Sequence, residues 1–257
     1  MDFAIIVVVS CLASLLTFFS GFGLGTILTP AFMMFFPVEI AIAMTGIVHF
    51  SNNLFKLGLI GKNINYPILL KFGVPAMLGG FGGAILLNEL NSFNDLISYS
   101  FAGWIFETRG VNLAIAGVMI FFAFFDLIPK LKKLEFSSNF LVPGGILSGF
   151  FGGLSGHQGA LRSAFLIKSG LTKEQFIATG VSVACLVDVS RLLIYSNSGS
   201  FESATDNLTL ILSATGAAFI GAIVGKKLLK KVTIDALQLF VGLLIIVLAI
   251  GLAIGLF

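Results

Sequence analysis

The sequence predicts an all-α polytopic membrane protein built from two repeats of inverted topology. Three observations predict this class. Of the 257 residues, 57% are hydrophobic and only 11% are charged, whereas soluble domains carry about 25% charged residues. Apolar runs separated by short polar breaks fill almost the whole chain, as expected for membrane helices. A glycine-rich motif also occurs once in each half.

Ten apolar segments follow one another along the chain. They fall at 3–19, 24–36, 38–60, 66–90, 110–128, 140–154, 158–169, 173–195, 206–226 and 234–256. A complete span needs about 20 residues. Two pairs of neighbouring segments are too short or too rich in glycine to cross the membrane fully. These pairs are 3–19 with 24–36 and 140–154 with 158–169. We expect each pair to form a re-entrant broken-helix hairpin, followed by three transmembrane helices.

The loop charges orient these segments. Acids without Lys or Arg mark the stretches "NELNSFNDL" and "SGSFESATDN", while the lysines gather in other loops, at Lys62, Lys130, Lys132, Lys133, Lys168, Lys173, Lys226, Lys227, Lys230 and Lys231. The positive-inside rule places the lysine loops in the cytoplasm. The segment between Lys133 and Lys168 then begins and ends inside, which favours a re-entrant hairpin with its tip at "GGLSGHQG". We expect a bacterial cytoplasmic (inner) membrane protein with both termini on the outer side.

The two halves of the chain resemble each other. "SGFGLGTILTPAF" resembles "LSGHQGALRSAF", and "FPVEIAIAMTG" aligns with "LTKEQFIATG" at a constant offset that pairs Gly25 with Gly159 and Thr45-Gly46 with Thr179-Gly180. "NLFK" resembles "DVSR" with one residue of slip. The loop at 61–66 is predicted inside and its mate at 196–206 outside, so the repeats 1–130 and 131–257 are predicted to be inverted within one membrane domain. Similarity of glycine-rich composition alone is the alternative. Inverted repeats with paired interrupted helices are typical of secondary transporters.

These motifs also suggest a family. A glycine-rich hairpin followed by "AxxTG" at the start of the next helix, once per half, resembles the TauE/SafE sulfite exporter family of membrane permeases. The resemblance covers nearly the whole chain and implies transport of sulfite, sulfonates such as sulfoacetate, or related small anions. The second tip departs from the glycine-rich pattern, since it carries His157, Gln158 and Arg162.

The hairpins predict where an anion would bind. The second half-helix of each hairpin starts near the membrane centre, and its N-terminus presents unpaired N–H groups and a partial positive charge. Two such ends, near Gly25-Thr26 and Gly159-Ala160, are expected to face each other. The predicted substrate-binding residues are Gly23, Gly25, Thr26, His49, Asn52, Asn53, Gly156, His157, Gln158, Gly159, Arg162, Cys185 and Asp188.

The polar side chains of this set have more than one interpretation. A buried Arg162 requires a partner, which is either an anionic substrate or Asp188. Thr45, His49, Asn52 or Asn53, and Lys56 share one helical face, as do Ser182, Cys185 and Asp188, with Arg191 beyond. His49 is either a hydrogen-bonded core histidine or a residue that contacts the anion or relays protons. His157 is equally a structural residue or a donor to the anion. In the outer loop, Glu107 and Arg109 are expected to form a local ion pair.

No enzyme motif is present. The sequence lacks zinc-ligand spacing, a phosphate-binding loop, a dinucleotide fingerprint and a nucleophile elbow, so no catalytic residue, cofactor or metal is predicted. Cys11 and Cys185 are expected to be small buried residues. The N-terminus lacks the basic region of a signal peptide and is expected to form the first membrane segment. The net charge of +3 lies in loops and indicates orientation, not a nucleic-acid surface.

The predicted function is therefore a secondary transporter, not an enzyme, that moves sulfite, thiosulfate or sulfoacetate across the membrane by alternating access. Two alternatives remain: a transporter or channel for another small anion such as a carboxylate, and a sulfur-relay membrane protein that uses Cys185. The expected partners are the anionic substrate and membrane lipid. Proton coupling through His49 or Asp188, the direction of transport and the oligomeric state are left open.

Overall fold

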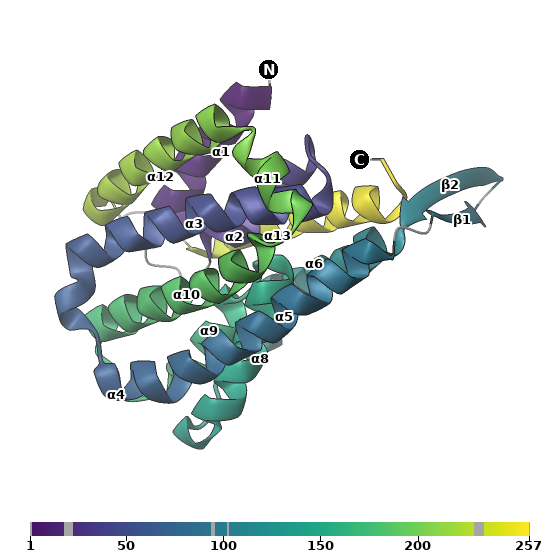
Figure 1. Ribbon diagram of the computed structural model, residues 1–257. Helices are drawn as coiled ribbons and strands as arrows, with labels where there is room; N and C mark the ends of the chain where they lie inside the picture. Colours follow the sequence, from purple (N-terminus) through teal and green to yellow (C-terminus); the bar gives the residue numbers. More distant parts are fainter. Residues whose placement is uncertain (1, 18–22, 94–95, 102, 229–233, 257) are drawn as a thin grey trace.

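The computed structural model describes residues 2–17, 23–93, 96–101, 103–228 and 234–256. The chain is mostly helical, and most of its long helices run in roughly the same direction as one bundle (Figure 1). The first half contains α1 (Asp2–Thr17), α2 (Leu24–Met33), α3 (Val38–Ile60), η1 (Gly61–Asn63), α4 (Tyr66–Ile68), the π-helical turn η2 (Leu69–Gly73), α5 (Val74–Ser92), β1 (Leu96–Phe101), β2 (Trp104–Arg109) and α6 (Gly110–Leu127).

The second half repeats the same order of long helices. It contains α7 (Pro129–Lys132), η3 (Ser138–Phe140), α8 (Leu141–Ser155), α9 (Gly159–Leu166), α10 (Lys173–Tyr195), α11 (Gly199–Thr205), α12 (Leu208–Leu228) and α13 (Ile234–Ala253). In the described part of the chain, three helical stretches are long and apolar enough to cross a membrane: Tyr66–Ser92, Lys173–Tyr195 and Leu208–Lys227. Four shorter apolar helices accompany them, which agrees with the predicted helical membrane protein.

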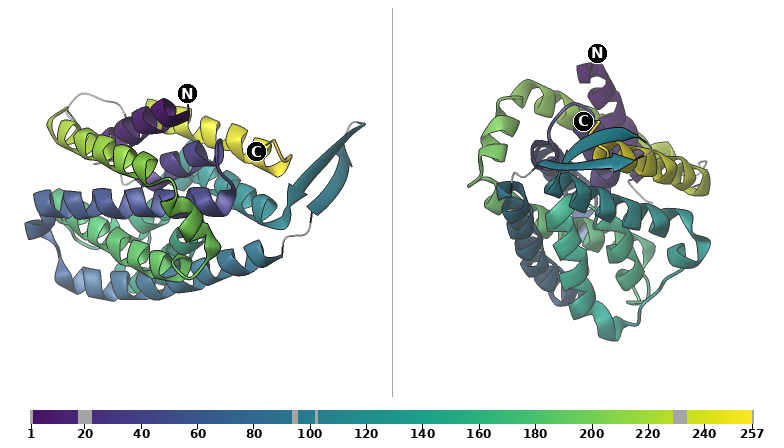
Figure 2. Two further views of the ribbon diagram at one scale, coloured as in Figure 1. Left: turned by 45° about the horizontal axis from the view of Figure 1, so that its top comes forward. Right: turned by 90° about the vertical axis from the view of Figure 1, so that its right-hand side faces the viewer.

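The all-α prediction is wrong in the outer loop, where β1 and β2 form an antiparallel hairpin. Leu96 lies opposite Arg109 and Tyr99 opposite Phe106. The hairpin projects from the end of the bundle opposite the α3–α4 connection (Figures 1 and 2). The Tyr99 hydroxyl donates to the carbonyl of Ala253 at 3.0 Å and so fixes the hairpin to the end of α13.

The predicted ion pair at the base of this hairpin is also different in the structure. The guanidinium of Arg109 donates to both carboxylate oxygens of Glu39, at 2.8 and 3.3 Å. Glu39 lies in the first turn of α3, so the pair links the N-terminal end of that helix to β2. The sequence neighbour Glu107 is not the partner.

Both predicted helix interruptions occur in the structure. The helix α1 ends at Thr17 and α2 begins at Leu24; the tip residues 18–22, including Gly21, lie outside the described residues. In the second half, α8 ends at Ser155 and α9 begins at Gly159. Gly156 adopts a left-handed conformation with φ of 79° and its N–H donates to the carbonyl of Gly152, a conformation that favours glycine. The second break spans residues 156–158, close to the gap at 155–157 between the predicted segments, and Gly152 and Gly153 of the predicted tip are helical.

Glycines let two pairs of helices pack backbone to backbone. The helix α5 packs along α8, and α1 packs along α12. A Cβ atom at Gly145, Gly149 or Gly153 of α8 would overlap with backbone carbonyls of η2 or α5, and one at Gly221 would overlap with the carbonyl of Cys11. Small residues that allow such close approach are typical of membrane helix interfaces.

The centre of the bundle is formed by α3 and α10, which pack against each other and are both 23 residues long. The polar residues predicted to share a face on each helix are buried there. On α3 these are Thr45, His49, Asn52, Asn53 and Lys56, and on α10 they are Ser182, Cys185, Asp188 and Arg191. The two predicted polar faces are therefore turned into the protein.

Candidate functional site

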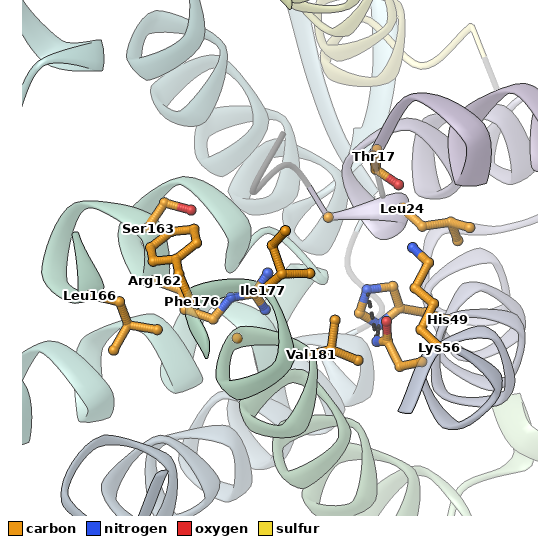
Figure 3. A pocket seen from close by; sticks show the side chains of 13 residues that line it. Thr17, Leu24, His49, Lys56, Arg162, Ser163, Leu166, Phe176, Ile177 and Val181 are labelled. Carbon is orange, nitrogen blue, oxygen red and sulfur yellow. Dashed lines mark hydrogen bonds between the residues drawn. The ribbon is translucent and has the colours of Figure 1, made fainter. Parts of the chain in front are cut away.

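A small cavity lies where α2, α3, α9 and α10 meet (Figure 3). Its volume is about 40 Å³, and a cavity needs roughly 10–15 Å³ to hold one water molecule. There is thus space for a few waters or one small ion. Its lining residues are Thr17, Gly23, Leu24, His49, Asn53, Lys56, Arg162, Ser163, Leu166, Phe176, Ile177, Gly180 and Val181.

Arg162 lies on one side of this cavity. It occupies the first turn of α9, where its N–H donates to the carbonyl of Gln158 at 3.0 Å. The side chain is 7% exposed, and its Nη1 atom has no hydrogen-bond partner among the described residues. A Cβ atom at Gly180 would lie 3.5 Å from the Nε atom of Arg162, so this glycine lets the guanidinium lie against α10.

The opposite wall is one face of α3, formed by His49, Asn53 and Lys56 (Figure 3). These residues are spaced at i, i+4 and i+7, so that they stack along one side of the helix. All three are buried, with exposed fractions of 3–4%. The two positively charged side chains at the cavity, Lys56 and Arg162, therefore come from different halves of the chain.

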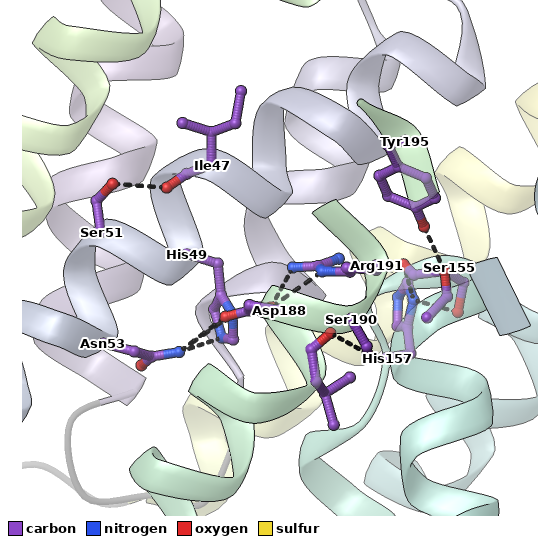
Figure 4. Close-up of polar contacts among 12 residues, drawn as sticks. Ile47, His49, Ser51, Asn53, Ser155, His157, Asp188, Ser190, Arg191 and Tyr195 are labelled. Atoms are coloured by element: carbon purple, nitrogen blue, oxygen red, sulfur yellow. Dashed lines mark hydrogen bonds and ion pairs between the residues drawn. The ribbon is translucent and has the colours of Figure 1, made fainter. Parts of the chain in front are cut away.

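A buried carboxylate on α10 organises the adjoining polar network (Figure 4). His49 Nδ1 lies 2.6 Å from Asp188 Oδ2, while Arg191 Nε and Nη2 lie 3.0 and 2.7 Å from Oδ1. Because a carboxylate only accepts, the Nδ1 proton of His49 is donated to Asp188. The lone pair of a neutral His49 is then on Nε2, which lies 3.3 Å from the amide nitrogen of Asn53.

The pairing of Asp188 answers one alternative left open by the sequence. Both of its oxygens are used, one by Arg191 and the other by His49 and Asn53. Within the described residues, no salt bridge joins Asp188 to Arg162. Asp188 therefore neutralises Arg191, its neighbour at i+3 on α10. The guanidinium of Arg162 lies at the cavity wall instead.

The buried charges are predominantly positive. Among the described residues, Lys56, Arg162 and Arg191 are buried cationic side chains, and Asp188 is the buried acid. Among these described side chains, the three cationic groups outnumber the one acid. Uncompensated charge is costly in a membrane interior, so this composition favours a negatively charged ligand.

The predicted glycine tips lie close together. A Cβ atom at Gly25, in the first turn of α2, would lie 3.2 Å from the carbonyl oxygen of Gly156. The N–H of Thr26 donates to the carbonyl of Gly23 at 3.0 Å. The N-terminal end of α2 thus lies beside Gly156, in the turn that precedes α9.

Other predicted site residues lie away from the cavity lining. Asn52 contacts Ser14 of α1 and joins α1 to α3. The ring of His157 stacks on Phe122 at a centroid distance of 5.9 Å, and its Nδ1 lies 3.0 Å from the carbonyl oxygen of Ser155. Cys185 is 7% exposed but is not among the lining residues. These positions depend on helix rotation, which the sequence does not specify.

Buried polar atoms without a hydrogen-bond partner cluster in the same region. Within the described part of the chain they are Thr29 Oγ1, Thr45 Oγ1, Asn112 Oδ1, His157 Nε2, both amide atoms of Gln158, Arg162 Nη1, and Arg191 Nη1 and Nη2. Arg191 Nη2 still lies at ion-pair distance from Asp188. All but Asn112 belong to the two interrupted segments or to the helix that follows each. Buried polar groups normally have partners, so this clustering marks a place for water or a polar ligand.

The predicted site omitted several residues of this region, among them the polar residues Lys56, Ser163, Arg191 and Thr29. Lys56 and Arg191 share the predicted polar faces and correspond to each other in the "NLFK" and "DVSR" similarity, which was the available signal. Thr29 and Ser163 follow the glycine motifs by four residues and correspond through the repeat offset. Their small hydroxyl groups gave no separate signal in the sequence.

The fold and the cavity define a helical membrane protein with a small polar cavity in its interior. The family model for the sulfite exporter TauE/SafE matches residues 6–252, so the chain belongs to the TauE/SafE sulfite exporter family. This family assignment confirms the predicted resemblance and, with the apolar helices, the prediction of a membrane transport protein. No curated protein and no solved structure matches the chain significantly.

Proposed function

We propose that the chain is a secondary transporter that carries a small sulfur oxyanion, such as sulfite, thiosulfate or sulfoacetate, by alternating access. The observation that carries this proposal is Arg162, a buried cation whose Nη1 atom has no hydrogen-bond partner among the described residues and which lies at the wall of a small cavity that Lys56 also lines. The family assignment supports a sulfur anion as the transported species.

The side chains at the cavity suit an oxyanion. A guanidinium can donate two parallel hydrogen bonds to neighbouring oxygens of one ligand, and Arg162 Nη1 is unpartnered among the described residues. Lys56 adds a second positive charge from the facing helix. The N-termini of α2 and α9 contribute N–H groups of positive partial charge at the tips of the two interrupted segments. The cavity volume of about 40 Å³ suits a compact ion more than an extended organic molecule.

Two inverted repeats, 1–130 and 131–257, supply the mechanical basis of the proposal. Under this repeat α1 corresponds to α8, α3 to α10, α5 to α12 and α6 to α13. Exchanging the two repeats then turns the contact of α1 with α12 into the contact of α8 with α5. The contacts of α3 with α10 and of α6 with α13 are each exchanged with themselves. This exchange, together with the constant sequence offset, supports rocking of one repeat against the other.

The loop lysines support a cytoplasmic-membrane location in which both termini lie outside. The cavity lies along the last three turns of α3 and the first turns of α10, close to Lys62, Lys168 and Lys173 in the sequence. In this orientation the cavity belongs to the cytoplasmic half of the protein.

The direct test is uptake of ³⁵S-labelled sulfite and thiosulfate into proteoliposomes, with sulfoacetate and acetate as competitors. Arg162→Ala is expected to reduce uptake at least about tenfold, because a hydrogen bond to a charged group contributes about 1.5–3 kcal/mol. The matched control is Lys168→Ala, which removes an exposed positive charge that pairs with Glu135 on the surface. Unchanged uptake by Arg162→Ala, or inhibition by acetate as strong as by sulfite, would refute the proposal.

The sulfur-relay alternative has no comparable support. Cys185 is buried, and among the described residues no base forms a hydrogen bond with its thiol. A relay requires the thiol itself, so Cys185→Ser would abolish activity under that mechanism. Under the transporter proposal the same variant retains most of its uptake.

A further inference from the structure

The residues that line the cavity have counterparts in the other half of the chain. Gly25 and Gly159 differ by 134 positions, and the same offset relates Ser163 to Thr29 and Gly180 to Gly46. It also relates the first-tip residues Gly23 and Leu24 to His157 and Gln158. With the one-residue slip found further along, Lys56 corresponds to Arg191. The cavity therefore has a mate region made of Thr29, Gly46, His157, Gln158 and Arg191.

This mate region is closed but polar. Thr29, Gln158 and Arg191 are fully buried and His157 is 1% exposed. Thr29 Oγ1, His157 Nε2, Arg191 Nη1 and both amide atoms of Gln158 lack a hydrogen-bond partner among the described residues. Packing alone would favour apolar side chains at such positions, because an unpaired buried polar group is destabilising.

The unpaired atoms converge on the second tip. A Cβ atom at Gly156 would lie 3.2 Å from Arg191 Nη1 and 3.3 Å from Thr29 Oγ1, which shows that both groups point at the same glycine. Figure 4 places Arg191 between Asp188 and the turn that carries Ser155 and His157. One edge of the guanidinium binds Asp188, while Nη1 faces the tip.

The two arginines are also seated alike. A Cβ atom at Gly180 would lie 3.5 Å from the Nε atom of Arg162, and one at the corresponding Gly46 would lie 3.5 Å from the Nε atom of Arg191. Each guanidinium thus rests against the glycine of a "TG" pair at equivalent points of the two central helices. The same kind of contact recurs on both sides of the bundle centre.

We propose that Arg191, Thr29 and Gln158 form a second oxyanion subsite, which is closed in this structure and receives the anion when the outer side of the protein opens. The inference rests on the proposed transport function and adds the residues of the outward-facing state. In the present state Asp188 holds Arg191. On opening, the Nη1 group of Arg191 and the hydroxyl of Thr29 donate to the anion, in the way that Arg162 and Ser163 serve the inner cavity.

Thiol accessibility tests this subsite against the inner one. Thr29→Cys and its repeat counterpart Ser163→Cys are each made in the full chain, reconstituted and treated with a membrane-impermeant thiol reagent on either side. The parent chain, with Cys11 and Cys185, gives the baseline. We expect Thr29→Cys to react from outside and Ser163→Cys from inside, each at least about threefold more slowly when thiosulfate is present.

The outcomes separate the two proposals. If Thr29→Cys does not react above baseline, or reacts without protection by thiosulfate, while Ser163→Cys is protected, the second subsite is wrong and the inner site stands. If thiosulfate protects neither position, the proposed function itself fails.

A shape-preserving variant covers the case in which the cysteine variants fold poorly. Thr29→Val removes an unpaired hydroxyl at nearly constant volume, so a purely structural role predicts an unchanged or raised Tm and unchanged uptake. The subsite predicts an unchanged Tm with uptake lowered about tenfold. Ser10→Ala is the control, since that buried hydroxyl already donates to the carbonyl of Ile6 in its own helix. Wild-type uptake by Thr29→Val would overturn the proposal.

Discussion

At the scale of single residues, three buried cations have different surroundings. Arg191 is held by Asp188 at 2.7 and 3.0 Å, whereas Arg162 and Lys56 lie at the wall of the cavity. Coulomb energy is proportional to the charge of the ligand. A cavity with two cationic side chains at its wall, Lys56 and Arg162, therefore favours an anion with two negative charges, such as sulfite or thiosulfate, over one with a single charge.

This charge matching predicts the effect of Lys56→Gln. We expect affinity for thiosulfate to fall at least about tenfold, because the side chain contributes a charged hydrogen-bond donor. Affinity for the monoanion methanesulfonate is expected to fall less. Competition against ³⁵S-thiosulfate uptake measures both affinities, with Lys62→Gln as the control because Lys62 is exposed just beyond α3. Equal losses for the two anions would contradict the charge matching.

The sequence identified the residue types of this site better than their partners. Arg162 stood out as a cation among apolar residues, and it is buried at the wall of the cavity. Asp188 was the obvious partner in the sequence, yet it pairs with Arg191 and His49. Which pairs form depends on the rotation of α9 against α10, and the apolar pattern of a helix of only eight residues, such as α9, does not specify that rotation.

At the scale of helices and strands, close packing through glycine predicts which helix faces tolerate substitution. Gly149→Leu in α8 would drive a side chain into the carbonyl of Ala76 in α5 and is expected to destabilise the protein by about 1–3 kcal/mol or more. Gly216→Leu in α12 is the matched control, since no neighbouring atom lies within 4 Å of a Cβ there. Thermal unfolding in detergent, followed by size-exclusion chromatography, compares the two. A Tm for Gly149→Leu equal to that of the control would show that this interface is wrong.

The helices and their interruptions were largely predictable, but the strands were not expected. Long apolar runs and glycine breaks have direct physical causes in the bilayer, and α3 and α10 match their predicted ranges of 38–60 and 173–195. The stretch "LISYSFAGWIFETR" alternates partly between apolar and polar residues around Ala102-Gly103, which is a hairpin signal. The alternation is hard to recognise because the stretch is almost as apolar as the membrane segments on either side of it.

At the scale of the whole molecule, the proposed inverted repeats fix which loops share a side of the membrane. We expect Gly103→Cys, in the turn of the β-hairpin, to react with an impermeant thiol reagent added outside intact cells. Lys62→Cys is expected to react only after the membrane is permeabilised. The positive-inside rule gives this assignment its physical basis. Reaction of both positions from the same side would exclude the proposed topology.

The architecture as a whole explains why a chain so rich in apolar residues keeps polar groups at its centre. Two interrupted segments bring helix N-termini to the middle of the bundle, and the central helices α3 and α10 turn their polar faces toward them. The sequence repeat predicted this arrangement in outline. Which helix faces meet at the cavity depends on the packing of all the helices together, and it follows from no local pattern.

The most direct measurement is a structure of the protein with bound thiosulfate, in which the anomalous signal of sulfur locates the anion. The account predicts a sulfur peak between α3, α9 and α10, within about 4 Å of the guanidinium of Arg162, and its loss in Arg162→Ala. Peaks confined to the exposed lysines or the β-hairpin, with an empty cavity between the interrupted helices, would contradict it.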